Sequence, residues 1–200
     1  MQRTYQLKQR GERRDETRQR IIEATLALHT SVGPARTTIS AIAERAGVER
    51  LTVYRHFPDE RALFTACSAL GRAKNPPPDP TPWRSILDPE TRLQTALSEI
   101  YAYYRRTEQR WVNLTRDAQI MPVVREAMEP LHKHWALMRE VLEAGWSVES
   151  SRRNLLHAAL GHALTFSTWQ SLVQEQGLAD EVAIELLVRM IRCITSEGAS

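Results

Sequence analysis

The sequence has few of the features that mark secreted or membrane-spanning proteins. Its 200 residues include two cysteines, Cys67 and Cys193, which provide no disulfide framework and fit a reducing compartment. No stretch approaches the ~18 consecutive apolar residues of a transmembrane helix. The N-terminal segment is polar and basic and lacks the apolar core of a signal peptide. The sequence therefore predicts a protein that works inside the cell.

Motifs for catalysis and metal binding are also missing. There is no glycine-rich phosphate loop, no nucleophile elbow and no HExxH sequence. His132 and His134 would lie on different faces of a helix, and His157 and His162, five positions apart, are poorly placed to share a metal ion. We predict no metal, no cofactor and no enzymatic activity, and a small all-α enzyme is the least favoured hypothesis.

Charge is distributed unevenly along the chain, although the formal net charge is only +3. Residues 1–72 contain 13 lysines and arginines against 8 acidic residues, a net +5. Residues 73–200 contain 14 against 16, a net −2. A basic N-terminal part favours contact with a polyanion such as nucleic acid.

Apolar residues recur at helical spacing through most of the chain, and no stretch alternates convincingly as a β-strand does. The clearest stripe advances by alternating steps of four and three residues and comprises Val124, Met128, Leu131, Trp135, Met138 and Leu142. A content of 42% hydrophobic and 26% charged residues is typical of a globular protein. The sequence therefore predicts an all-α fold of about nine helices.

Composition divides the chain into four parts. Residues 1–14 hold five Arg or Lys and predict a flexible basic arm, either a solvated tail or a segment that contacts DNA. Residues 15–73 are predicted to form a first helical domain. Residues 74–83 contain five prolines and predict an extended connector, or alternatively a loop inside one compact unit. Residues 84–200 are predicted to form a second helical domain.

Two short helices are predicted to meet at Gly47. Thr38 caps the first, which runs to about Arg45, and the second runs from Glu49 to about His56. Their apolar residues would pack inward and leave cationic and hydrogen-bonding groups outside, which is the layout of a helix-turn-helix that reads DNA. The candidate DNA-contacting residues are Thr37, Thr38, Arg45, Glu49, Arg50, Leu51, Thr52, Tyr54, Arg55 and His56.

The second of these helices would place its N-terminal residues in the major groove. Arg50 could pair with a guanine edge, Thr52 with a base or a phosphate, and Leu51 with a thymine methyl group. Glu49 could accept a hydrogen bond from cytosine. Alternatively, its carboxylate could interact favourably with the helix dipole at the N-terminus of the helix. Most of the other candidates flank this helix, where phosphates would pass.

Residues 15–64 resemble the N-terminal domain of the TetR family of bacterial transcriptional regulators. The matching elements are Ile21-Ile22-Glu23-Ala24, Thr38-Ile39 with Ile42-Ala43, Ala46-Gly47-Val48, Val53-Tyr54-Arg55-His56-Phe57-Pro58-Asp59 and Leu63-Phe64. The resemblance implies a homodimeric repressor or activator in the bacterial cytoplasm, associated with the nucleoid, whose C-terminal domain binds a small molecule. It also implies that the last two long helices, about 150–175 and 179–196, form a dimer bundle.

Three positions depart from the family pattern. The family often has a lysine at the start of its fourth helix, where it contacts phosphate; this chain has Glu60 there, and we assign the phosphate contact to Arg61. Leu51 stands where the family often has a small residue, so base preference cannot be carried over from relatives. His29 stands where a phenylalanine is common and is predicted to be a hydrogen-bonded core histidine.

Aromatic residues gather in the middle and late helices of the second domain. At helical spacing such residues fill a core or line a pocket, and the family resemblance favours a pocket for a hydrophobic or aromatic effector. Asp117 and His134 are further polar candidates. The candidate ligand-binding residues are Tyr101, Tyr104, Trp111, Arg116, Trp135, His162 and Phe166.

The sequence favours two hypotheses about function, which belong to different classes. The first is a ligand-responsive homodimeric repressor that binds an inverted repeat in double-stranded DNA. The alternative is a helical interaction protein that binds DNA to position itself and acts through a protein partner, with no small-molecule effector. The first predicts a ligand cavity in the second domain, and the alternative predicts a filled core.

Overall fold

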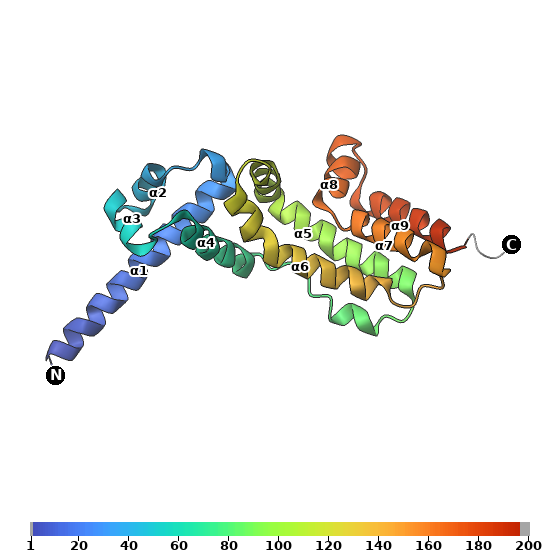
Figure 1. The fold of residues 1–200 in the computed structure, drawn as a ribbon, viewed down its shortest axis with the longest axis horizontal. Coiled ribbons are helices and arrows are strands. Elements are labelled where there is room, and N and C mark those ends of the chain that lie inside the picture. Colours follow the sequence, from blue (N-terminus) through green and yellow to red (C-terminus); the bar gives the residue numbers. More distant parts are fainter. Residues whose placement is uncertain (1, 197–200) are drawn as a thin grey trace. The chain divides into compact units, whose positions relative to one another are not determined.

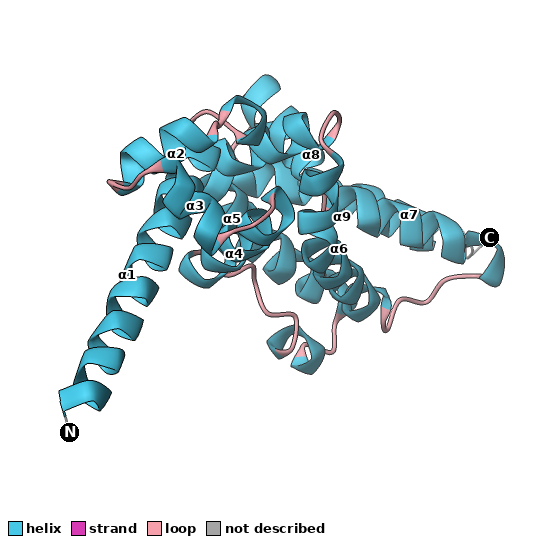
Figure 2. Ribbon diagram, turned by 60° about the vertical axis from the view of Figure 1, so that its left-hand side comes forward, coloured by secondary structure: helices cyan, strands magenta, loops and turns pink. Residues whose placement is uncertain are grey.

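The computed structural model describes residues 2–196, and every regular element in this range is a helix (Figures 1 and 2). The predicted all-α fold is confirmed for these residues, and none of their helices combines the length and apolar composition needed to cross a membrane. The α-helices are α1 (Gln2–Ser31), α2 (Ile39–Ala46), α3 (Arg50–His56), α4 (Glu60–Lys74), α5 (Pro89–Ala118), α6 (Pro122–Glu143), α7 (Arg153–Ala163), α8 (Phe166–Trp169) and α9 (Asp180–Ser196).

Shorter helical segments connect several of these helices. Three of them are 3-10 turns, η1 (Pro34–Arg36), η2 (Pro82–Ser85) and η3 (Ser150–Arg152). The fourth, η4 (Gln170–Glu175), is a π-helix that continues directly from α8. Such π-helical segments are rare in proteins and are usually short.

The first compact unit combines the chain up to Pro76 with Glu108–Met128, so the ends of α5 and α6 belong to it together with α1–α4. Its core is an apolar cluster from α1, α2, α3 and α4. Local signals define the short helices: the Thr38 hydroxyl accepts from Ala41 N at 3.1 Å, and the Asp59 carboxylate accepts from Ala62 N at 2.7 Å. Gly47 has φ 65° and ψ 43°, a left-handed conformation that glycine adopts without steric cost and that ends α2. The buried residues of the cluster are Ile21, Ile22, Ala24, Ile42, Ala43, Ala46, Val53, Phe57, Leu63 and Cys67.

The second compact unit combines Pro77–Thr107 with the chain from Glu129 onward. Two charged side chains hold its elements together. The Arg92 guanidinium is buried and donates to the carbonyl oxygens of Ile86 and Ala144, which joins the start of α5 to the residue after α6. The Asp180 carboxylate at the start of α9 accepts from Arg105 on α5 and from the Trp169 indole on α8.

The N-terminal segment differs from its prediction as a flexible arm, because residues 2–14 continue α1. The segment is rich in Gln, Arg, Lys and Glu, which have good intrinsic helix propensity. Gly11 is the exception, and a single glycine inside a helix costs only about 1 kcal/mol. The composition that suggested an arm therefore equally suits a solvated helix.

The segment predicted as an extended connector is a loop in its middle part only. The carbonyl oxygen of Pro78 accepts from His134 Nε2 at 2.8 Å, and the buried Trp83 donates its indole N–H to Glu99 at 3.2 Å. From Pro78 onward, this segment is therefore packed within the second unit.

The long helix predicted over 150–175 is wrong, because this range contains η3, α7, α8 and η4 in succession. The interruption lies at Thr165, which has extended backbone (φ −77°, ψ 147°). Its hydroxyl accepts from Thr168 N at 3.3 Å, so a new helix begins there. The helix predicted over 179–196 is present as α9.

Candidate nucleic-acid interface

Helix α3 buries Val53 and turns most of its other side chains outward. Leu51 is 71% exposed and Tyr54 is 47% exposed, and Arg50 and Arg55 are exposed as well. Of the remaining candidates, Arg45 and Glu49 are exposed, and Thr52 and His56 are half-buried. The outward face that the sequence predicted is present, and contact with DNA stays a prediction for each residue.

Two threonines before α2 already have structural roles. The Thr37 hydroxyl donates to the carbonyl oxygen of Gly33 at 2.8 Å, which uses its proton. The Thr38 hydroxyl accepts from Ala41 N and keeps its own proton to donate. Because phosphate oxygens only accept hydrogen bonds, Thr38 is better suited than Thr37 to a phosphate contact through its hydroxyl.

Glu49 occupies the N-cap position of α3, yet its side chain makes no capping hydrogen bond. Its backbone carbonyl accepts from Thr52 N at 2.9 Å, as expected where a helix begins. The carboxylate is exposed and is not used in local structure, so it can meet a base edge.

Two arginines of α1 lie close to this face: Arg18, which was not among the predicted contacts, and Arg14, which lies in the segment 1–14 that was predicted as a tail or a DNA-contacting arm. The Arg18 guanidinium lies 4.9 Å from the centroid of the Phe57 ring. Partial burial lowers the pKa of His56, and the positive charges of Arg14, Arg55 and Arg18 lower it further. Arg14 and Arg18 are four residues apart and share a helix face. A predicted first helix that included residue 14 would have placed both arginines on this face. The positive charges around His56 would suit a phosphate.

Arg61 makes an ion pair at 2.7 Å with Glu126 on α6. Its side chain is 71% exposed, and exposed ion pairs contribute only about 0–1 kcal/mol to stability. A phosphate could therefore compete for Arg61, but the guanidinium would have to leave Glu126 to reach it.

Four of the predicted ligand-binding residues come together in the second unit. Tyr101, Tyr104, Trp135 and Phe166 form one aromatic cluster with Tyr103 and Trp169, at ring-centroid distances between 5.3 and 6.4 Å. We call these six residues the aromatic cluster.

Two side chains of the aromatic cluster donate to the same carbonyl group. Leu164 O, at the end of α7, accepts from the Tyr104 hydroxyl at 2.6 Å and from the Trp135 indole at 2.9 Å. Trp135 Nε1 also lies 2.8 Å from the Tyr104 oxygen. Burial is the main reason that the pKa of Tyr104 is raised far above its usual value, so its hydroxyl stays protonated. Contacts of this kind are those of a packed core.

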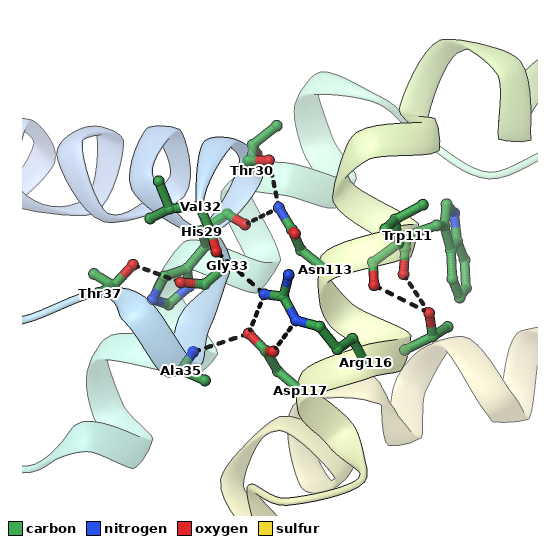
Figure 3. Close-up of polar contacts among 12 residues, drawn as sticks. His29, Thr30, Val32, Gly33, Ala35, Thr37, Trp111, Asn113, Arg116 and Asp117 are labelled. Atoms are coloured by element: carbon green, nitrogen blue, oxygen red, sulfur yellow. Dashed lines mark hydrogen bonds and ion pairs between the residues drawn. The ribbon is translucent and has the colours of Figure 1, made fainter.

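The other three predicted ligand-binding residues are divided between the two units. Trp111 and Arg116 lie on the part of α5 that belongs to the first unit. Arg116 is bound to Asp117 and to the backbone after α1 (Figure 3). His162 is exposed, and its ring Nε2 lies 3.2 Å from the Thr168 hydroxyl.

His29 is a hydrogen-bonded core histidine, as predicted. It is 6% exposed, and its Nδ1 lies 3.4 Å from Cys67 Sγ, while its ring centroid is 4.6 Å from that of Phe64. Burial lowers the pKa of His29 to about 4, with a smaller effect from Arg110 in the same direction. Burial also raises the pKa of the Cys67 thiol to about 11, so both groups are neutral at pH 7.

We expect His29 to make the fold less stable as the pH falls. The unfolded chain, with an ordinary histidine pKa near 6.5, takes up a proton before the folded chain does, so protonation favours unfolding. The stabilisation is complete above about pH 6.5 and is lost as the pH falls toward about 4, with a loss of about 2 kcal/mol by pH 5. Denaturant unfolding of the wild type and His29→Phe at pH 7.5 and 5 would measure it. The same pH dependence in both proteins would contradict this assignment.

The family described as "Bacterial regulatory proteins, tetR family" matches residues 21–67. Among curated relatives, the chain is similar to the HTH-type transcriptional repressor KstR of Rhodococcus jostii, at 34% identity over 119 residues, which cover 56% of this chain and 46% of that protein. It is also similar to KstR of Mycolicibacterium smegmatis, at 44% identity over 62 residues, which cover 31% and 29% of the two chains. The chain thus spans about half the length of these relatives or less.

Solved structures resemble the chain over most of its length. NalD, the secondary repressor of the MexAB-OprM multidrug efflux pump in Pseudomonas aeruginosa, has a TM-score of 0.56 at 21% identity, covering 91% of this chain and 96% of that one. A TetR-like transcriptional regulator from Rhodococcus sp. RHA1 has a TM-score of 0.60 at 19% identity, covering 88% and 93%. At such identities the likeness establishes the fold alone. The named curated relatives are transcriptional regulators rather than enzymes, and with the family match they identify residues 21–67 as a segment of the TetR family of bacterial regulatory proteins.

Proposed function

We propose that this protein is a transcriptional repressor of the bacterial nucleoid that binds an inverted-repeat operator as a homodimer and responds to a small hydrophobic or aromatic ligand. Binding to DNA as a regulator is what its curated relatives have in common. The observation that carries the proposal is the exposed face of α3, with Arg50 and Leu51 at its start, held over a buried apolar core and bordered by the arginines of α1.

In the proposed complex, the first turn of α3 enters the major groove. Arg50 is placed to donate two hydrogen bonds to a guanine, and Leu51 is placed to contact a thymine methyl group. Tyr54, Arg55 and the cationic surroundings of His56 border the groove and contact phosphates, which fixes the register of the helix. Two such helices, about 34–36 Å apart in a dimer, would read successive major grooves on one face of the duplex.

The homodimer is supported by an exposed apolar stripe in the second unit. Val182, Leu186 and Met190 are four residues apart on α9 and are 49%, 40% and 57% exposed. Leu155 on α7 is 54% exposed. Large apolar side chains in a row on one helix face mark a surface that another protein covers. A second copy of the same surface is the partner that a two-fold axis supplies.

Ligand response would require a rearrangement of the aromatic cluster. A ligand that entered the aromatic cluster would have to separate rings in direct contact and compete for the Leu164 carbonyl. The packed state of the aromatic cluster favours the alternative, a DNA-bound protein that acts through a protein partner with no effector. A screen of small molecules by thermal shift separates the two, because a ligand that binds the folded state raises the melting temperature.

We expect Arg50→Ala and Arg55→Ala to affect DNA binding in different ways. Loss of a guanine contact should weaken binding to a selected duplex by about 1–3 kcal/mol and relax the base preference at one position in each half-site. Loss of a phosphate contact should weaken binding to all duplexes similarly and reduce the salt dependence by about one counterion per site. Selection from random DNA followed by gel-shift titration at several salt concentrations measures both effects.

Arg84→Ala is the matched control, since it removes an exposed arginine from η2, which belongs to the second unit and not to the predicted interface. It should leave both affinity and base preference unchanged. If Arg50→Ala and Arg55→Ala behave like Arg84→Ala, the face of α3 does not read DNA and the proposed function is wrong.

A further inference from the structure

Three polar side chains near the C-terminal end of α5 bind the backbone where α1 ends (Figure 3). The Asn113 side-chain amide donates to the carbonyl oxygens of Thr30 at 2.7 Å and of His29 at 3.3 Å. The last carbonyl groups of a helix have no partner within that helix, so Asn113 supplies hydrogen bonds that α1 cannot make by itself. Asn113 is itself only 2% exposed, so these bonds are sheltered from water.

Arg116 and Asp117 extend this contact into the turn that follows α1. Arg116 Nη2 donates to Val32 O at 3.1 Å, and Arg116 Nε donates to Asp117 Oδ1 at 2.7 Å. The other carboxylate oxygen of Asp117 accepts from Ala35 N at 2.9 Å. Burial by itself would raise the pKa of Asp117, but hydrogen bonds from Arg116 and Ala35 lower it below its usual value. The carboxylate therefore stays charged although Asp117 is 1% exposed.

The turn is shaped to receive these side chains. Gly33 has φ +93°, a conformation that other residues rarely adopt. A Cβ atom at this position would lie 2.7 Å from Asp117 Oδ2 and would also collide with the Arg116 guanidinium. The absence of a side chain at Gly33 is what lets α5 approach this closely.

The same turn sets where α2 begins. The carbonyl of Gly33 accepts from the Thr37 hydroxyl at 2.8 Å, and Thr38, the next residue, caps α2. A shift of the turn would therefore move α2, and α3 would follow because Val53 packs in the same core as Ile42.

We propose that Asn113, Arg116 and Asp117 form a clamp on the α1–α2 turn that positions α2 and α3 for recognition of a specific DNA sequence. This inference rests on the proposed function. The clamp lies outside residues 21–67, the segment that matches the family. Its three members are positioning residues, since they act on the reading helix through the turn.

Two isosteric substitutions test the clamp. Asn113→Asp removes both donors, and Asp117→Asn removes the charge that binds Arg116. Thr115→Ala is the matched control on the same helix, because the Thr115 hydroxyl bonds only to carbonyls of α5 itself. Each protein is titrated against a duplex that the wild type selects from random DNA and against an unrelated duplex of equal length. Circular dichroism at the assay temperature reports whether each variant is folded.

We expect the clamp variants to bind the selected duplex about 10-fold or more weakly and the unrelated duplex within about 2-fold of the wild type, because non-specific affinity depends on surface charge. Thr115→Ala should match the wild type on both. A purely structural role would instead lower the melting temperature and leave the preference for the selected duplex unchanged, which would overturn the inference. A wild type that prefers no duplex would overturn the proposed function itself.

A third variant covers the case in which the buried substitutions prevent folding. The Arg116 side chain is 41% exposed, so Arg116→Ala removes one arm of the clamp from a partly exposed position. It should reduce the preference for the selected duplex and increase the hydrogen exchange of the Ala35 amide, measured without DNA. Unchanged preference and unchanged exchange in this variant would also overturn the clamp.

Discussion

Replacing both Leu186 and Met190 with aspartate is expected to turn the proposed dimer into a monomer. The two side chains are neighbours on the exposed face of α9, and a groove of about 280 Å³ beside them is lined in part by His162 and Leu172. Four carboxylates facing each other across a two-fold axis would be desolvated without partners, which opposes association strongly. Sedimentation equilibrium at micromolar concentration would measure the change.

The loss of the dimer should weaken operator binding by about 100- to 10,000-fold. In a dimer, the second subunit binds its half-site at a high effective concentration once the first is bound, and this increases the affinity by that factor. Leu87→Asp is the matched control, since Leu87 is an apolar residue that is 88% exposed and lies outside α7 and α9. A double variant that remains dimeric, or a monomer that binds its operator as tightly as the wild type, would show that this surface has another role.

Tyr104→Ala is expected to cost about 3–5 kcal/mol in the free energy of unfolding. Tyr104 is fully buried, and its ring contacts those of Tyr103, Trp135, Phe166 and Trp169. Removing the ring would leave a cavity at the centre of the aromatic cluster. Urea unfolding at pH 7 would measure the loss.

Two conservative variants separate packing from hydrogen bonding at this site. Tyr104→Phe keeps the ring and should cost about 1 kcal/mol, because Leu164 O retains its bond from Trp135. Tyr101→Phe should cost less, because the Tyr101 hydroxyl reaches Ala163 O only at 3.5 Å. If Tyr104→Ala costs under about 1 kcal/mol, the aromatic cluster is loosely packed and a ligand pocket there gains support.

Local sequence signals were sufficient to predict the helix-turn-helix. Thr38, Gly47 and Asp59 each define a helix end through hydrogen bonds or backbone angles within a few residues. The apolar spacing between these ends gave the buried faces of α2 and α3. Features that depend on short stretches of chain can be predicted because no distant partner has to be known.

The candidate site in the second domain was predicted only in part. Tyr104 and Trp135 come together as expected, but Arg116 and His162 lie elsewhere, since helical periodicity gives the face of a residue and not its partner helix. Asn113 was missed because a lone asparagine inside a predicted helix has no distinctive pattern. Its two acceptors lie 83 and 84 residues away in the sequence.

The location of the proposed clamp limits how this protein can be divided for engineering. A chimaera that joins residues 1–76 to the effector domain of another regulator would keep α1–α4 and lose Asn113, Arg116 and Asp117. The basic side chains of the chimaera would still attract DNA, yet we expect the chimaera to discriminate poorly between DNA sequences. Transplanting Glu108–Ala118 together with residues 1–76 should restore discrimination. The segment that must be transferred as one functional unit is therefore discontinuous in the gene.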